Sequence, residues 1–167
     1  LAAASAANVV AGAPRLVIWL VAIGAGIIGG ALWILIPALL RARFGTNEIV
    51  TTIMFNYVAL SLTAWLVKGP LRDTSIVAPQ TPSIPREDRF SLLLDTRVHI
   101  GIVLALIVWA GFAWWLSGTE AGFNLRATGE NPRAARHALI PVGLVAAGAL
   151  IASGAVAGLA GANDMLS

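Results

Sequence analysis

Two arginines in a short polar segment, residues 130–136, have the spacing to bind a protein partner. Arg133 and Arg136 stand three positions apart, so on a helix their side chains would share one face. Guanidinium groups donate charge-assisted hydrogen bonds to carboxylates, often two at a time. The pair therefore predicts a surface that docks onto an acidic patch of another protein. The alternative is an ordinary solvated loop helix with its arginines near lipid.

The residues around these arginines favour a short helix. Asn131 is a favoured N-cap, and Pro132 is the favoured first helical residue. Ala134 and Ala135 favour helix and would present a small surface that fits a cleft. We therefore expect the docking surface to comprise Glu130, Asn131, Pro132, Arg133, Ala134, Ala135 and Arg136.

A second group of polar residues lies inside an apolar run, residues 49–67. Asn56 is well inside that run, where an unpaired amide is costly, so it must face other helices or a wet cavity. Thr52 and Thr63 lie on the same helical face. One interpretation is a hydrogen bond from Asn56 to a neighbouring helix. The other is a solute path, in which Asn56 offers donors and an acceptor, lined by Thr52, Phe55, Asn56 and Thr63.

Other kinds of chemistry find no support in the sequence. His99 and His137 lie far apart at the ends of apolar runs, with no metal-ligand spacing and no Ser–His–Asp set. Cysteine is absent, and no apolar run contains a charged residue, which argues against a proton relay. The phosphate-binding pattern G-x-x-x-x-G-K-[ST] is also missing. We therefore expect neither an enzyme nor a cofactor in this chain.

Four long apolar runs must position these segments: 16–40, 49–67, 98–117 and 138–162. As a helix, each is long enough to cross a hydrocarbon core of roughly 30 Å. The runs predict an all-α membrane protein, a bundle of at least four transmembrane helices. Because the chain begins with Leu and stops as an apolar run ends, we expect it to be an excerpt of a larger protein.

The composition agrees with a membrane protein. The chain is 58% hydrophobic and 11% charged, whereas soluble domains carry about 25% charged residues. Eleven Lys and Arg against eight Asp and Glu give a net charge of +3, and the basic residues lie between or beside the apolar runs. That placement favours contact with a lipid bilayer and its headgroups over binding to nucleic acid.

The loops between the runs alternate between two sides of the membrane. Loops 41–48 and 118–137 share one side, and loop 68–97 lies on the other. Basic residues divide almost evenly between the sides, so the positive-inside rule leaves the orientation open. Within the long loop, residues 85–97 are predicted to form an amphipathic surface helix that starts after Pro85.

Small residues mark the first and fourth runs. Gly26 and Gly30 form a G-x-x-x-G pair, and so do Gly154 and Gly158. In lipid, small residues let helix backbones approach closely. We expect these faces to pack against other helices; the alternative is a flexible element of a transport path.

Three stretches resemble the permease subunits of bacterial ABC importers, in the branch that handles nucleosides and simple sugars of the ribose type. Residues 45–59, GTNEIVTTIMFNYVA, are similar to that branch's G-x-N-E-x-x-x-T-x-M-x-N-Y signature. Residues 122–136, GFNLRATGENPRAAR, resemble its cytoplasmic loop, and residues 153–164, SGAVAGLAGAND, resemble a later helical run. The order and approximate spacing also agree, and the resemblance covers Arg41 to the end of the chain.

The resemblance implies that residues 1–167 are part of one transmembrane permease domain in a multi-pass protein of the bacterial plasma (inner) membrane. Loop 118–137 would be the cytoplasmic coupling loop, and loop 68–97 would be extracytoplasmic. The implied partners are a cytoplasmic ABC ATPase that binds ATP, a second permease subunit and an extracytoplasmic substrate-binding protein. The implied function is the ATP-driven import of a nucleoside or simple sugar.

The apolar runs on their own allow a different function. Without the resemblance, the chain could equally be a non-transporting membrane scaffold or a small channel subunit. One departure from the family pattern is also visible after residue 136. The family tends to have Gly at the position of Leu139, and Leu there is expected to stiffen the exit from the loop.

Overall fold

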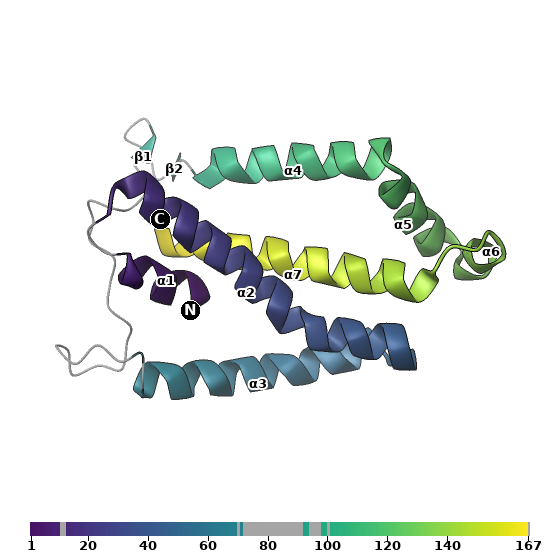
Figure 1. Ribbon diagram of the computed structural model, residues 1–167, viewed down its shortest axis with the longest axis horizontal. Coiled ribbons are helices and arrows are strands. Elements are labelled where there is room, and N and C mark those ends of the chain that lie inside the picture. Colours follow the sequence, from purple (N-terminus) through teal and green to yellow (C-terminus); the bar gives the residue numbers. More distant parts are fainter. Residues whose placement is uncertain (11–12, 70, 72–91, 94–97, 100, 167) are drawn as a thin grey trace.

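The computed structural model describes residues 1–10, 13–69, 71, 92–93, 98–99 and 101–166 (Figure 1). These ranges are almost entirely helical, and four of the helices are long and apolar enough to cross a membrane. The four are α2 (Arg15–Phe44), α3 (Glu48–Lys68), α4 (Gly101–Gly118) and α7 (Val142–Leu166). The predicted all-α bundle of at least four membrane helices is confirmed.

The remaining elements are short. Three helices precede or connect the long ones: α1 (Ala2–Val9), α5 (Glu120–Glu130) and α6 (Pro132–His137). Two-residue strands β1 (Leu92–Leu93) and β2 (Val98–His99) pair antiparallel, with Leu92 opposite His99. The alanine-rich helix α1 was not predicted, since its sequence lacks the length of a membrane span.

The long helices differ from the predicted runs at their ends. Helix α2 continues to Phe44, where the carbonyl of Arg41 accepts a hydrogen bond from Gly45 N–H at 3.0 Å and Gly45 adopts a left-handed conformation. Helix α4 starts only at Gly101, since the residues before it pair as strand β2. Helix α7 starts at Val142 rather than Ala138, because the chain turns sharply before it.

The amphipathic helix predicted for residues 85–97 is wrong where it can be checked. Leu92–Leu93 forms strand β1 instead of a helical turn. Short apolar runs do not distinguish strand from helix by pattern, and pairing with Val98–His99 decides in favour of the strand. Residues 85–91 and 94–97 lie outside the described residues.

Helices α2 and α7 form the most intimate packing in the described structure, side by side at the centre of Figure 1. Their glycines face one another: a methyl group on Gly26 would come within 2.7 Å of the Gly158 carbonyl oxygen. Gly30 is tighter still, since a methyl group there would overlap the Gly154 carbonyl oxygen. Such contacts let two backbones meet and gain dispersion energy over their length. The predicted packing role of both G-x-x-x-G pairs is confirmed.

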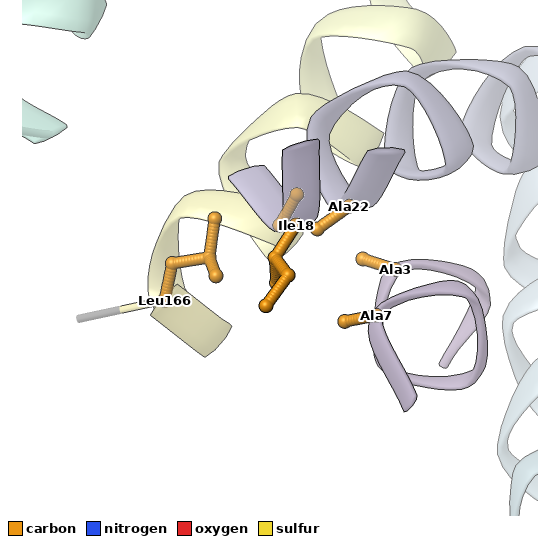
Figure 2. Close-up of a cluster of buried hydrophobic side chains, with 6 residues drawn as sticks. Ala3, Ala7, Ile18, Ala22 and Leu166 are labelled. Carbon is orange, nitrogen blue, oxygen red and sulfur yellow. The ribbon is translucent and has the colours of Figure 1, made fainter. Parts of the chain in front are cut away.

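A small apolar cluster closes one end of this helix pair (Figure 2). Helix α1 places Ala3 and Ala7 against Ile18 and Ala22 of α2, and Leu166 of α7 completes the cluster. Ile18 and Leu166 are almost fully buried. Alanine on the facing helix leaves room for these larger side chains, which explains why an alanine-rich helix packs here.

Helices α3 and α4 lie on opposite sides of the α2–α7 pair (Figure 1). Helix α3 has no buried residue, and in α4 only Gly101 is buried. Their side chains are mainly apolar and largely exposed, as expected of surfaces that face lipid or further helices. The fold therefore consists of a tightly packed central pair with two peripheral spans.

Candidate functional site

Helix α6 begins as the sequence predicted. The Asn131 Oδ1 atom accepts hydrogen bonds from the backbone N–H groups of Arg133 and Ala134, both at 3.1 Å. Pro132 occupies the first turn, where its missing N–H costs no hydrogen bond. Glu130 is the last residue of α5, so Asn131 joins the two helices. The predicted cap is confirmed, and α6 is held in a defined orientation relative to α5.

The exposed face of α6 is narrower than predicted. Arg133, Ala134 and Arg136 are exposed, but Ala135 is only 3% exposed. The prediction that Ala134 and Ala135 together present a small surface is therefore wrong for Ala135, which is buried where α6 packs on α5 and α7. A partner can reach the two guanidinium groups and the single methyl group of Ala134.

The exit from α6 uses a left-handed residue. Leu139 has φ 62°, the only positive φ of a non-glycine residue in the described ranges. Its N–H donates to the Arg136 carbonyl and the Ile140 N–H donates to the Ala135 carbonyl, both at 3.0 Å. This is the Schellman arrangement, which usually places glycine at the left-handed position. Leu139, which stands where the family tends to have glycine, therefore occupies a position whose left-handed backbone favours glycine.

Helix α5 leaves α4 through a tight corner. The Thr119 hydroxyl accepts a hydrogen bond from Gly122 N–H at 3.1 Å and donates to the Trp115 carbonyl at 2.8 Å. Gly122 packs directly against the backbone of Trp115 and Leu116, where a side chain would collide. This polar segment is therefore two capped helices attached firmly to the end of a membrane span.

The four residues predicted to line a solute path have different surroundings on α3. The Thr52 hydroxyl donates a hydrogen bond to the Glu48 carbonyl at 2.8 Å, so its partner lies within its own helix. The Phe55 ring meets Trp33 edge to face, with centroids 5.9 Å apart. Thr63 and Trp33 line a cavity of about 390 Å³ between α1, α2, α3 and α7. Asn56 is exposed on α3 and lies outside this cavity's lining.

A larger cavity, about 500 Å³, lies between α4 and α7. Its wall on α4 is aromatic, and the rings of Phe112 and Trp115 are 5.4 Å apart. Its polar lining includes Asn163, whose Oδ1 atom is buried without a hydrogen-bond partner among the described residues. The sequence showed these aromatic residues only as part of an apolar run, which carries no information on cavities.

An ion pair joins the ends of α2 and α3. Arg41 Nη1 lies 2.8 Å from Glu48 Oε2 and donates a hydrogen bond to the Thr46 carbonyl at 3.1 Å. Asn47 caps α3 by accepting from Ile49 N–H at 3.0 Å. The pairing of Arg41 with Glu48 was not predicted from the sequence. The available signal was an Asn cap followed by a first-turn Glu, with an Arg in the last turn of the preceding helix.

No group of His, Asp and Glu side chains in the described ranges could hold a metal ion. The candidate site comprises helix ends and cavities. Its exposed part is α6, and its membrane part is the surface of α3 with the adjoining cavity.

Comparison with known proteins identifies the family. Residues 1–166 match the family described as branched-chain amino acid transport system / permease component. The chain is 36% identical over 142 residues to the guanosine ABC transporter permease protein NupP of Bacillus subtilis, covering 82% of this chain and 40% of that protein. It is 31% identical over 157 residues to the nucleoside ABC transporter permease protein NupB of Lactococcus lactis, covering 89% and 43%.

A third relative is named for a different solute. The glucose ABC transporter permease protein TsgB13 of Haloferax volcanii is 29% identical over 158 residues, covering 83% of this chain and 41% of the relative. No solved structure shows a significant match. The chain thus spans about 40% of the length of the relatives that it matches. With its four apolar helices and its match over residues 1–166, the chain belongs to this family of membrane permease components.

Proposed function

We propose that this chain forms part of the permease subunit of an ATP-driven importer and that its solute is a nucleoside. The observation that carries the proposal is α6, a capped helix between two membrane spans that exposes Arg133, Ala134 and Arg136. Two relatives named for guanosine or nucleoside transport support the solute class. A simple sugar is the second candidate, supported by the relative named for glucose.

The proposed partner at α6 is a cytoplasmic ABC ATPase, which would bind and hydrolyse ATP. Rigid caps at both ends of α6 suit a helix that must transmit force, since a frayed end would absorb the movement. A second permease subunit and an extracytoplasmic substrate-binding protein complete the proposed importer, in a bacterial plasma membrane. In this orientation α6 lies on the cytoplasmic side and loop 68–97 on the extracytoplasmic side.

The proposed solute path runs along α3 and remains assigned to Thr52, Phe55, Asn56 and Thr63. Support comes from Thr63, which lines the cavity beside α3, and from Phe55, which packs on Trp33 of the same cavity wall. Asn56 is a polar side chain exposed on a membrane span. Lipid offers it no hydrogen bond, so it requires water, solute or another helix as its partner.

Uptake by the full-length permease tests the function. The permease would be reconstituted in proteoliposomes with its ATPase and binding protein, and accumulation of labelled guanosine and labelled glucose would be measured with and without ATP. ATP-dependent guanosine accumulation is the expected result. Accumulation of glucose alone would select the sugar, and accumulation of neither would favour the scaffold or channel function.

The ATPase contact can be tested separately by replacing Arg133 and Ala134 with Glu. Two carboxylates on this face would repel an acidic partner surface, and the glutamate side chain at position 134 would be too bulky for a contact that fits alanine. We expect the ATPase to be lost on co-purification. Arg15→Glu is the matched control, since Arg15 is exposed at the start of α2, at the end of the molecule away from α6. Retention of the ATPase by the Arg133/Ala134 variant would exclude α6 as the docking helix.

A further inference from the structure

A mostly apolar cavity that contains three polar side chains lies where the α2–α3 turn meets α5 and α7. Its volume is about 300 Å³, and its polar side chains are Arg41, Glu48 and Thr128. The rest of the lining consists of small and apolar residues from α5 and α7. The neighbouring backbones are close, since a methyl group on Gly143 of α7 would lie 3.2 Å from the Ala42 carbonyl oxygen of α2. This end of the molecule is also the end that carries α6 (Figure 1).

Thr128 is the unusual member of this lining. It is 8% exposed, and its hydroxyl has no hydrogen-bond partner among the described residues. The hydroxyls of Thr52 and Ser117, by contrast, donate hydrogen bonds to carbonyls of their own helices. A buried hydroxyl without a partner is costly, so its exceptions call for an explanation. The Thr128 hydroxyl therefore needs a hydrogen-bond partner that the described side chains do not supply.

The ion pair across the cavity offers complementary groups. Arg41 uses Nη1 for both Glu48 and the Thr46 carbonyl, and a guanidinium carries five N–H donors in all. The side chains of Arg41 and Glu48 are 36% and 40% exposed, so neither is enclosed by protein. A cavity of this size can hold a water molecule where two to four polar groups converge to bond it, even if the rest of the lining is apolar. Thr128, Arg41 and Glu48 provide such a set.

We propose that water in this cavity bonds the Thr128 hydroxyl to the Arg41–Glu48 ion pair. We call this water-bridged network of Thr128, Arg41 and Glu48 the polar joint, and we propose that it makes α3 follow movements of α5 and α6. The inference rests on the proposed function, because it assigns Arg41 and Thr128 as positioning residues for transport. Neither residue contacts the solute in this scheme. Thr128 carries the movement from the ATPase side, and Glu48 receives it as the first residue of α3.

The weak attachment of α3 explains why a polar joint matters. None of its residues is buried, and it packs on α2 much less closely than α7 does. Apolar packing therefore holds α3 loosely, and its position depends on its N-terminal end. The Arg41–Glu48 pair and the Asn47 cap fix that end. Asn56, the proposed path residue, lies on the same helix.

The test measures solute transported per ATP hydrolysed by the full-length permease with its ATPase in proteoliposomes. Thr128→Val removes the hydroxyl and keeps the branched shape, and Thr128→Ala removes it without adding a methyl group. We expect each variant, and Arg41→Gln, to lower the transport ratio about fivefold while ATP hydrolysis continues. Thr128→Ser should couple normally. Arg43→Gln is the matched control, since Arg43 is exposed in the same turn of α2 and lies outside the cavity lining.

The double variant Thr128→Val with Arg41→Gln distinguishes a joint from two separate effects. If both residues act through one network, the double variant should couple no worse than Arg41→Gln alone. A normal ratio in both Thr128→Val and Thr128→Ala would overturn the inference, as would a double variant that shows the product of the two single losses. Failure of the wild-type permease to accumulate any solute would instead overturn the proposed function.

Discussion

Gly26 and Gly158 bring two membrane helices into backbone contact, so tightly that a methyl group on Gly26 would lie within 2.7 Å of the Gly158 carbonyl oxygen. Gly30 and Gly154 repeat the contact one turn along. The close approach explains why α2 and α7 share the most extensive packing of the described residues. We call this contact between the glycines of α2 and α7 the glycine seam.

Gly158→Leu is expected to destabilise the permease by about 3 kcal/mol or more, because no space exists for the side chain between the backbones. The measurement is the thermal unfolding midpoint of the full-length protein in detergent. Gly148→Leu is the matched control on the same helix, since nothing lies within 4 Å of a methyl group there. Equal unfolding midpoints for the two variants would contradict the packing of the seam.

Asn131→Ala should weaken the start of α6 by about 1 kcal/mol, because two backbone N–H groups lose their acceptor. In transport, we expect lower ATP-dependent uptake with reduced ATPase co-purification. Asn131→Asp keeps an oxygen at the cap and should retain both properties. If the Ala and Asp variants retain equal amounts of ATPase, the cap has no part in docking.

Leu139→Gly should stabilise the protein by roughly 1 kcal/mol, since the left-handed conformation costs an L-residue roughly 1–2 kcal/mol and glycine loses more chain entropy on folding. Leu144→Gly is the comparison, because Leu144 is also exposed but lies in regular helix, where glycine costs about 1 kcal/mol. Opposite shifts in the unfolding midpoint are expected. A loss of stability in both variants would contradict the strained turn.

Asn56→Leu should abolish uptake while leaving assembly intact, because the helix keeps its apolar surface and loses a donor and acceptor from the proposed path. Assembly is measured by co-purification of the ATPase, and uptake by labelled guanosine. Asn56→Gln keeps the amide and should retain part of the transport. Normal uptake by Asn56→Leu would remove Asn56 from the path.

The sequence was sufficient for features that depend on local composition. Long apolar runs gave the four membrane helices, and Asn131 with Pro132 gave the start of α6. Features that depend on how elements meet were missed. The burial of Ala135 depends on which face of α6 turns toward α5 and α7, and the Arg41–Glu48 pair depends on the geometry of the turn between two helices.

The boundaries of the spans show the same division. The last turn of α2 is helical although it contains Arg41 and Arg43, because cations near a helix C-terminus are favourable and extend the helix beyond its apolar part. A hydrophobicity pattern ends at the first charge, so it places the turn too early. At the start of α7, the left-handed backbone of Leu139 interrupts the apolar run 138–162, so the helix begins only at Val142.

The cluster of Ile18 and Leu166 lies at the end of α2 and α7 farthest from α6 (Figure 1), and α1 covers it (Figure 2). The helix pair is therefore held by apolar packing at the end opposite α6, and under the proposed function the ATPase would push on the α6 end. A push on α6 would turn the pair about this cluster as a pivot, with the glycine seam keeping both helices in step. Displacement would then be largest near the Arg41–Glu48 turn and smallest near the N-terminus.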